Sequence, residues 1–202
     1  NIRVHSEGEE YVGGIVGRLL DQSISTIVAG DVVVTAPHAG KVGGVVGSAE
    51  YQKQNDSAYS MEYNTVKAVV EAGRDEKPGA VTSVGGLAGS TTNWRYIRYN
   101  TVEADIRAEN ASEVGGLIGT RQEATCKNPY LEMYYNMVSA KVKGYDLVGG
   151  MTGLSEQPQY YNYMWTYYDL AAVQVTAVKD TDTHAAFFYN EKNSDGKIIR
   201  DQ

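Results

Sequence analysis

A glycine motif that recurs five times constrains the fold more than any other feature of the sequence. Val-Gly-Gly-x-x-Gly recurs at spacings of 30, 42, 30 and 34 residues. Recurrence at such periods is typical of solenoids, in which each repeat is one structural unit stacked on the next. The glycines of the five copies are Gly13, Gly14, Gly17, Gly43, Gly44, Gly47, Gly85, Gly86, Gly89, Gly115, Gly116, Gly119, Gly149, Gly150 and Gly153.

A second motif lies between the glycine motifs, and its three clearest copies are 36 residues apart. These copies are Tyr63-Asn64-Thr65-Val66, Tyr99-Asn100-Thr101-Val102 and Tyr135-Asn136-Met137-Val138. Weaker copies begin at Ser25 and at Tyr168. Equal spacing predicts that Asn64, Asn100 and Asn136 stack as an amide ladder at a corner of the fold.

Small and branched apolar residues extend this alignment with a period of two. One predicted column holds Val32, Val70, Ile106, Val142 and Val175, and another holds Gly30, Ala68, Ala104, Ala140 and Val173. Period two within a segment indicates a strand, and recurrence between segments indicates stacking of equivalent strands. The sequence therefore predicts an all-β protein, a parallel β-helix or β-solenoid of about five coils.

Charged residues between these columns agree with the predicted register. Lys67 is expected beside Glu103, and Asp105 beside Lys141, so opposite charges meet on neighbouring strands. Pairs of this kind contribute little stability but oppose register slip. A further expected column holds Asp31, Val69, Asp105, Lys141 and Gln174.

The pattern changes near the C-terminus. Residues 185–189 and 197–199 flank an Asp195-Gly196 turn, which predicts a terminal hairpin able to cap the solenoid. We therefore divide the chain into a solenoid of repeats over residues 1–178 and a C-terminal cap or hairpin over residues 179–202. The N-terminal residue is Asn1, and we expect a mature form or an excised fragment.

Composition and charge argue against several partners and sites. The chain has 18 basic and 25 acidic side chains, for a net charge of −7, which disfavours binding to nucleic acid or anionic lipid. Cys126 is the single cysteine and the three histidines are dispersed, so we expect no disulfide, metal site or cofactor. No apolar run is long enough for direct membrane insertion.

The glycine motif also resembles a known repeat family. Val-Gly-Gly-Leu-Ala-Gly at Val84 and Val-Gly-Gly-Leu-Ile-Gly at Val114 are similar to the GLUG repeat, and the resemblance covers most of the chain. GLUG repeats occur in bacterial surface and secreted proteins, including adhesins and the non-catalytic N-terminal region of immunoglobulin A-cleaving zinc metallopeptidases. The resemblance implies an extracellular or cell-surface location and a scaffold. The His-Glu-x-x-His of those peptidases is absent from this sequence.

Motifs that would carry catalysis are weak. Five glycine copies without a following helix pattern disfavour a phosphate-binding loop, and Gly-x-Ser-x-Gly is absent. The acidic segment from Glu191 to Gly196 departs from calcium loops, and a plain Asp-Gly turn explains it better. Parallel β-helices also host polysaccharide-processing enzymes, but no aligned carboxylate pair is apparent. We expect a protein that is not an enzyme.

Aromatic residues are the strongest candidates for binding. Tyr63, Tyr99 and Tyr135 are expected to form a stacking ladder with a structural role. Exposed aromatics suit sugar rings or protein surfaces, so other positions are candidate ligand contacts. These are Trp94, Tyr96, Tyr130, Tyr160, Tyr163, Trp165 and Tyr167. The alignment places Trp94, Tyr130 and Tyr163 in one column and Tyr96 and Trp165 in another.

Two functions remain open at this stage. An adhesive module would present this aromatic face to a host glycan or glycoprotein. A passive spacer or scaffold would contact only neighbouring domains of a longer surface protein or metallopeptidase. A glycan-processing β-helix enzyme is the third, weaker alternative.

Overall fold

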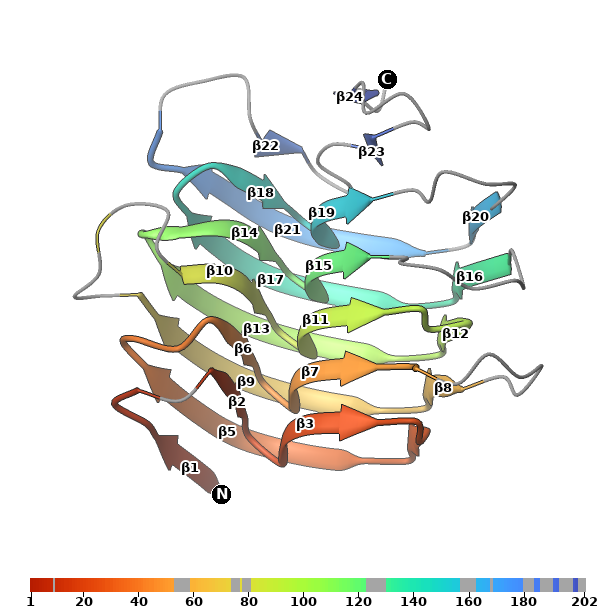
Figure 1. The fold of residues 1–202 in the computed structure, drawn as a ribbon, viewed down its shortest axis with the longest axis horizontal. Coiled ribbons are helices and arrows are strands. Elements are labelled where there is room, and N and C mark those ends of the chain that lie inside the picture. The colour runs from red at the N-terminus through yellow and green to blue at the C-terminus, as the bar shows by residue number, and fades with distance from the viewer. Residues whose placement is uncertain are drawn as a thin grey trace.

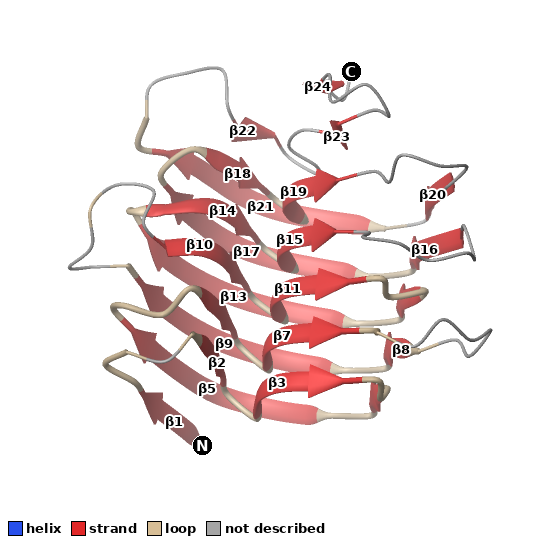
Figure 2. Ribbon diagram, viewed as in Figure 1, coloured by secondary structure: helices blue, strands red, loops and turns tan. Residues whose placement is uncertain are grey.

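The computed structural model describes residues 1–8, 10–52, 59–73, 77, 81–122, 130–156, 163–167, 169–179, 184–185, 191–192 and 198–199. In this part of the chain every regular element is a β-strand, and Figure 2 shows four sheets and no helix. None of the described elements is therefore a helix of the length and apolarity that crossing a membrane requires.

The chain visits four sheets in a fixed order and then repeats that order (Figure 1). The long sheet contains β1 (Ile2–His5), β5 (Val28–Ala36), β9 (Thr65–Ala72), β13 (Thr101–Ala108), β17 (Met137–Gly144) and β21 (Leu170–Ala177). The second sheet contains β2 (Tyr11–Gly13), β6 (Lys41–Gly43), β10 (Val81–Gly85), β14 (Ala111–Gly115), β18 (Leu147–Gly149) and β22 (His184–Ala185).

In each repeat the chain then forms one strand of the third sheet and one strand of the fourth. The third contains β3 (Val16–Leu20), β7 (Val46–Glu50), β11 (Ala88–Thr92), β15 (Ile118–Gln122), β19 (Thr152–Glu156), β23 (Glu191–Lys192) and β24 (Ile198–Ile199). The fourth contains β4 (Ile24–Ser25), β8 (Ser60–Glu62), β12 (Tyr96–Arg98), β16 (Tyr130–Tyr134) and β20 (Tyr163–Tyr167). Neighbouring strands are parallel within all four sheets apart from the pair β23–β24, an arrangement consistent with a parallel β-helix or β-solenoid.

The predicted register is confirmed over most of the long sheet. Val70, Ile106, Val142 and Val175 form one column, and Ala68, Ala104, Ala140 and Val173 form another. The five valines that open the glycine motifs also pair in sequence along the second sheet.

The prediction is wrong in the first repeat. Val34, not Val32, pairs with Val70, and Val32 pairs with Ala68. The mismatch is two residues. Ala29, not Val28, already pairs with Val66, and a β-bulge between Ala29 and Val32, in which Asp31 adopts a positive φ of 52°, adds the second residue. Asp31 therefore leaves the column that contains Asp105, and Val33 takes its place.

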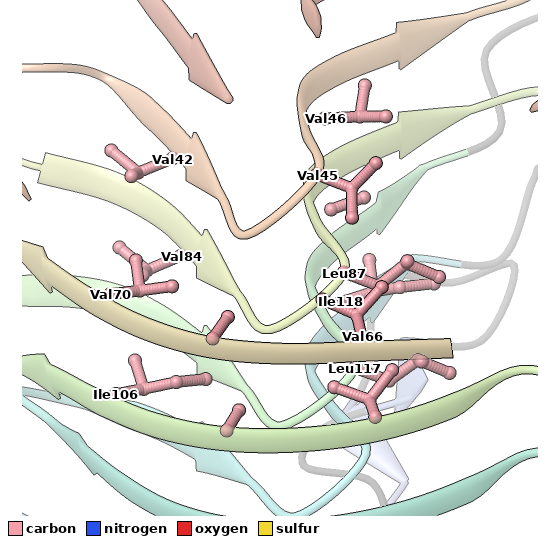
Figure 3. Packing of buried hydrophobic residues seen from close by; sticks show 14 of the residues in the cluster. Val42, Val45, Val46, Val66, Val70, Val84, Leu87, Ile106, Leu117 and Ile118 are labelled. Carbon is pink, nitrogen blue, oxygen red and sulfur yellow. The ribbon is translucent and has the colours of Figure 1, made fainter. Parts of the chain in front are cut away.

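Apolar side chains from the long sheet and the other sheets fill the interior. Figure 3 shows Val70 and Ile106 near Val42 and Val84, with Leu87 further along the same core. All five side chains are buried. Each contributes about 1.5–3 kcal/mol relative to an exposed position.

Glycine is required where the second position of the motif approaches the long sheet. A Cβ on Gly86 would lie 2.2 Å from the carbonyl oxygen of Gly116 and 2.9 Å from the Cβ of Ala104. Gly44 has the same environment one repeat earlier, against Gly86 and Ala68. This close approach to the long sheet is therefore the reason for glycine at this position of the motif.

The C-terminal hairpin differs in its first strand from the prediction. Glu191–Lys192 pairs antiparallel with Ile198–Ile199, whereas His184–Ala185 pairs in parallel with β18. Residues 186–189 of the predicted arm lie outside the described residues. Because Ala185 belongs to the second sheet, the hairpin begins later in the chain than predicted. The boundary at residue 178 stays a prediction.

Candidate ligand-binding surface

Three tyrosines form an exposed edge where the fourth sheet meets the long sheet. Tyr63, Tyr99 and Tyr135 have positive φ values of 57°, 55° and 54°, and their exposed fractions are 54%, 36% and 45%. Each of these left-handed tyrosines lies between a strand of the fourth sheet and a strand of the long sheet, and it is exposed whereas the asparagine after it is buried. Thr26, also at positive φ, is the equivalent residue in the first repeat.

The asparagines form the predicted amide ladder. Nδ2 of Asn64 donates to Oδ1 of Asn100 at 2.9 Å, and Nδ2 of Asn100 donates to Oδ1 of Asn136 at 2.9 Å. Each Oδ1 also accepts from the backbone N–H of the preceding asparagine, at 3.2 Å. All three residues are fully buried, so the ladder holds the corner beneath the tyrosine edge.

The tyrosine rings stack on one another. Ring centroids of Tyr63 and Tyr99 are 4.8 Å apart with 5° between planes, and those of Tyr99 and Tyr135 are 5.3 Å apart with 9° between planes. Both faces of Tyr99 are therefore covered, and the ring of Tyr134 lies 5.5 Å from it at an interplanar angle of 80°. Because sugars stack on ring faces, Tyr99 is poorly placed for that contact, and the geometry favours the structural ladder expected from the sequence.

Arg98, in the strand beside the tyrosine edge, contacts side chains of its own strand and of the two neighbouring strands. Its Nε lies 2.6 Å from Oε2 of Glu62, its Nη1 donates to the hydroxyl of Tyr134, and its guanidinium lies 4.5 Å from the ring centre of Tyr96. Burial alone would lower the pKa of Arg98, but the hydrogen bonds to Tyr134 and Glu62 outweigh it and raise the pKa. Arg98 is thus a fixed cation that links three neighbouring strands.

The structure describes only two of the side chains that were predicted to contact a ligand, Trp94 and Tyr96. Trp94 is only 1% exposed and packs in the core, so its place on an exposed binding face is wrong. The reason is that Trp94 lies in the connection between β11 and β12, and the alternation of a strand does not predict which way a side chain in such a connection points. Tyr96 is half-buried, and Arg98 covers part of its ring. Tyr160 and the side chains of Tyr130, Tyr163, Trp165 and Tyr167 lie outside the described part of the chain.

Backbone pairing nevertheless tests part of the predicted aromatic alignment. Tyr130 pairs with Tyr163, and Tyr96 and Trp165 both pair with Glu132. The column shared by Tyr96 and Trp165 is therefore confirmed at the level of the backbone.

A groove crosses the outer face of the long sheet. Its volume is about 900 Å³, and residues from all six strands of the sheet line it. Six strands at a spacing of about 4.8 Å give it a length of roughly 24 Å. Polar groups available along it include the outward side chains of Arg3, Ser139, Lys141 and Gln174.

Charges in and beside the groove are mixed. Lys67 and Glu103 form the predicted ion pair, with Nζ 2.8 Å from Oε1. Asp105 is paired in register with Lys141 as predicted, but its ion pair is with Arg107, at 2.6 Å. A lining of paired charges, amide and hydroxyl suits a ligand rich in hydroxyl groups better than one with a high charge of a single sign.

Metal binding has no support within the described ranges. No group of three or more histidine, cysteine, aspartate or glutamate side chains is placed there to hold an ion.

Asp169 ends the amide ladder in the last repeat. Its Oδ1 accepts from Nδ2 of Asn136 at 3.0 Å and from the backbone N–H of Asn136 at 2.7 Å. Oδ2 is buried and has no hydrogen-bond partner among the described residues. Burial, opposed by these two hydrogen bonds from Asn136 and by the charge of Arg121, raises the pKa of Asp169 above its ordinary value.

We expect Asp169→Asn to stabilise the protein at neutral pH. A carboxyl with a raised pKa in the folded state favours folding below its unfolded pKa, and that contribution is lost as the pH rises through the folded value. The variant should therefore gain stability relative to the parent as the pH rises from acid towards neutral, through the range in which the carboxyl of Asp169 ionises. Urea unfolding of both proteins across this range tests the expectation, and an unchanged difference at all pH values would contradict it.

Comparisons with known proteins identify no relative. No protein-family model matches the chain, and neither a curated protein nor a solved structure does.

The cluster of Glu62, Arg98 and Tyr134 and the groove on the long sheet were not predicted from the sequence. Glu62, Arg98 and Tyr134 are spaced at 36 residues, as the asparagines are, so this spacing was a signal for the cluster. The groove has no such signal, because it depends on the curvature of the whole sheet rather than on residue type.

Proposed function

We propose that this chain is a non-enzymatic repeat module of a bacterial surface or secreted protein, and that it binds an extended glycan or glycoprotein along the outer face of its long sheet. In this proposal the fold is a β-solenoid of about five coils with a C-terminal capping hairpin. The observation that carries the binding function is the groove, which runs across all six strands of the sheet.

Two features support an extended polymer over a compact ligand. Equivalent positions recur at each strand spacing of about 4.8 Å, so a repeating ligand meets similar backbone geometry at each step. The groove is also open rather than enclosed, and its outward hydrogen-bonding groups, such as Lys141 and Gln174, lie beside apolar ones such as Val69. The bacterial and extracellular part of the proposal rests on the resemblance of the glycine motif to GLUG repeats.

A passive spacer is the second candidate. It is favoured by the tyrosine edge, because the stacked rings and the buried amide ladder tie neighbouring repeats together. A spacer of this kind would hold neighbouring domains of a longer protein apart and would bind no ligand of its own.

Binding to an array of glycans and mucins tests the two candidates. The groove variant is Ser139→Ala/Lys141→Ala/Gln174→Ala, in which all three side chains are exposed. Loss of these groups is expected to weaken binding by about 10–100-fold, from roughly 1 kcal/mol for each hydrogen bond. The control variant is Asp146→Asn/Lys179→Gln, which removes an exposed ion pair that does not line the groove.

The outcomes separate the candidates. Binding by the parent and the control but not by the groove variant supports the groove as the site. Equal binding by all three proteins overturns the groove as the site. Absence of binding by the parent overturns the adhesive function and favours the spacer.

A further inference from the structure

The tyrosine edge brings together three phenols that are far apart in the sequence. Tyr99 lies 36 residues from both Tyr63 and Tyr135, yet its ring stacks on theirs at centroid distances of 4.8 and 5.3 Å. All three side chains are exposed, the least of them at 36%. Each of the three residues therefore keeps contact with solvent, although both ring faces of Tyr99 are covered by its neighbours.

This arrangement suits a reaction of phenols rather than the binding of a ligand to ring faces. We propose that the tyrosine edge is a site of oxidative cross-linking, at which a haem peroxidase using hydrogen peroxide joins Tyr99 to Tyr63 or Tyr135. The bond would form between Cε carbons of stacked neighbours and would tie adjacent repeats together covalently.

The coupling removes two electrons and two protons from the two phenols. Each of two phenols gives one electron to the peroxidase and one proton to solvent, leaving two phenoxyl radicals. The radicals combine through one new Cε–Cε bond, and the hydrogen on each coupled carbon moves to the phenol oxygen, restoring both aromatic rings. Two hydrogen atoms leave the protein in total, and one hydrogen peroxide is reduced to two molecules of water.

Geometry distinguishes this edge from another tyrosine pair. Tyr51 and Tyr59 also have ring centroids 4.8 Å apart, but their planes are tilted by 42° and Tyr51 is only 7% exposed. An oxidant in solution reaches Tyr51 poorly, so a radical pair is less accessible there. Coupling is therefore expected at the edge in preference to the pair Tyr51–Tyr59.

Mass spectrometry of the peroxidase-treated protein tests the proposal. Trypsin releases Tyr99 in the peptide 99–107, which contains no other tyrosine, and Tyr63 in the peptide 54–67. The expected product is peptide 99–107 joined to 54–67 or to 128–141, lighter than the sum of the two peptides by two hydrogen atoms. Fragmentation of the joined peptides assigns the bond to Tyr63 or Tyr135, because 54–67 also contains Tyr59 and 128–141 also contains Tyr130 and Tyr134. A mixture of isotope-labelled and unlabelled protein distinguishes bonds within one chain from bonds between chains.

Tyr99→Phe is the decisive variant. Phenylalanine keeps a ring in the stack but has no hydroxyl hydrogen to lose, so the cross-linked peptides should disappear while the fold is retained. Tyr145→Phe is the control, because it also removes one phenol but lies outside the edge, beside Lys179. This control should cross-link as the parent does.

Two results would overturn the proposal. One is oxidation of the parent without a bond from Tyr99 to either neighbour. The other is the same yield of these bonds from protein unfolded in urea, because the stacked geometry would then have no part in the reaction. Tyr63–Tyr99 or Tyr99–Tyr135 bonds formed within one folded chain, and lost in Tyr99→Phe, support it.

Discussion

Gly86→Ala is expected to destabilise the protein strongly, because the described core has no room for the added methyl group. The new Cβ would lie 2.2 Å from the carbonyl oxygen of Gly116, and that oxygen belongs to the backbone of the next repeat, which cannot rotate away. The second sheet must then move away from the long sheet at Ala104, and the packing of the apolar side chains between the two sheets is lost. We expect a loss of about 3–5 kcal/mol in the free energy of unfolding, measured in urea.

Gly30→Ala is the matched control. No atom lies within 4 Å of the position that its Cβ would occupy, so its effect should stay within about 0.5 kcal/mol. If both variants lost the same stability, a general intolerance of alanine for glycine would explain the result, and the close approach at Gly86 would not.

Asn100→Ala should have an effect of similar size for a different reason. Asn100 is fully buried, and its Nδ2 donates to the backbone oxygen of Met61 and to Oδ1 of Asn136, both at 2.9 Å. Its Oδ1 accepts from the side chain and the backbone of Asn64. Alanine leaves these buried groups without partners, at about 1–3 kcal/mol for each group that water does not reach, and we expect a total of about 3–5 kcal/mol.

Asn110→Ala serves as the comparison for Asn100→Ala. Asn110 is half-buried, and its Nδ2 donates to the backbone oxygen of Gly73 at 2.8 Å. Its loss should cost about 1 kcal/mol, the usual value for one hydrogen bond near the surface. Thermal and urea unfolding of both variants provides the measurement. An equal loss in the two would mean that Asn100 contributes no more to stability than Asn110 does.

Sequence alone predicted the features that depend on equal spacing. The 36-residue interval aligned Asn64, Asn100 and Asn136, and it also placed Lys67 beside Glu103, so both the amide ladder and this ion pair could be foreseen. Stacking in a parallel sheet converts equal spacing directly into contact, which is why these predictions needed no knowledge of the rest of the fold.

Features that depend on local departures from the repeat could not be foreseen. The bulge at Asp31 shifts the register by one residue. A single aspartate within a strand segment is not enough to predict a bulge from the sequence. The burial of Trp94 depends on how the segment between two sheets turns, which periodicity does not specify. The groove depends on the curvature of six strands together.

The ion pairs between strands also bear on how such an array can change its number of repeats. Glu62–Arg98, Lys67–Glu103 and Glu71–Arg107 each join a residue to one 36 positions later. An exact tandem duplication of residues 98–133 would set Arg98, Glu103 and Arg107 beside copies of themselves. Like charges would then lie opposite each other in three columns, which destabilises neighbouring strands. Duplication of this repeat would therefore need compensating substitutions for the longer array to be as stable as the present one.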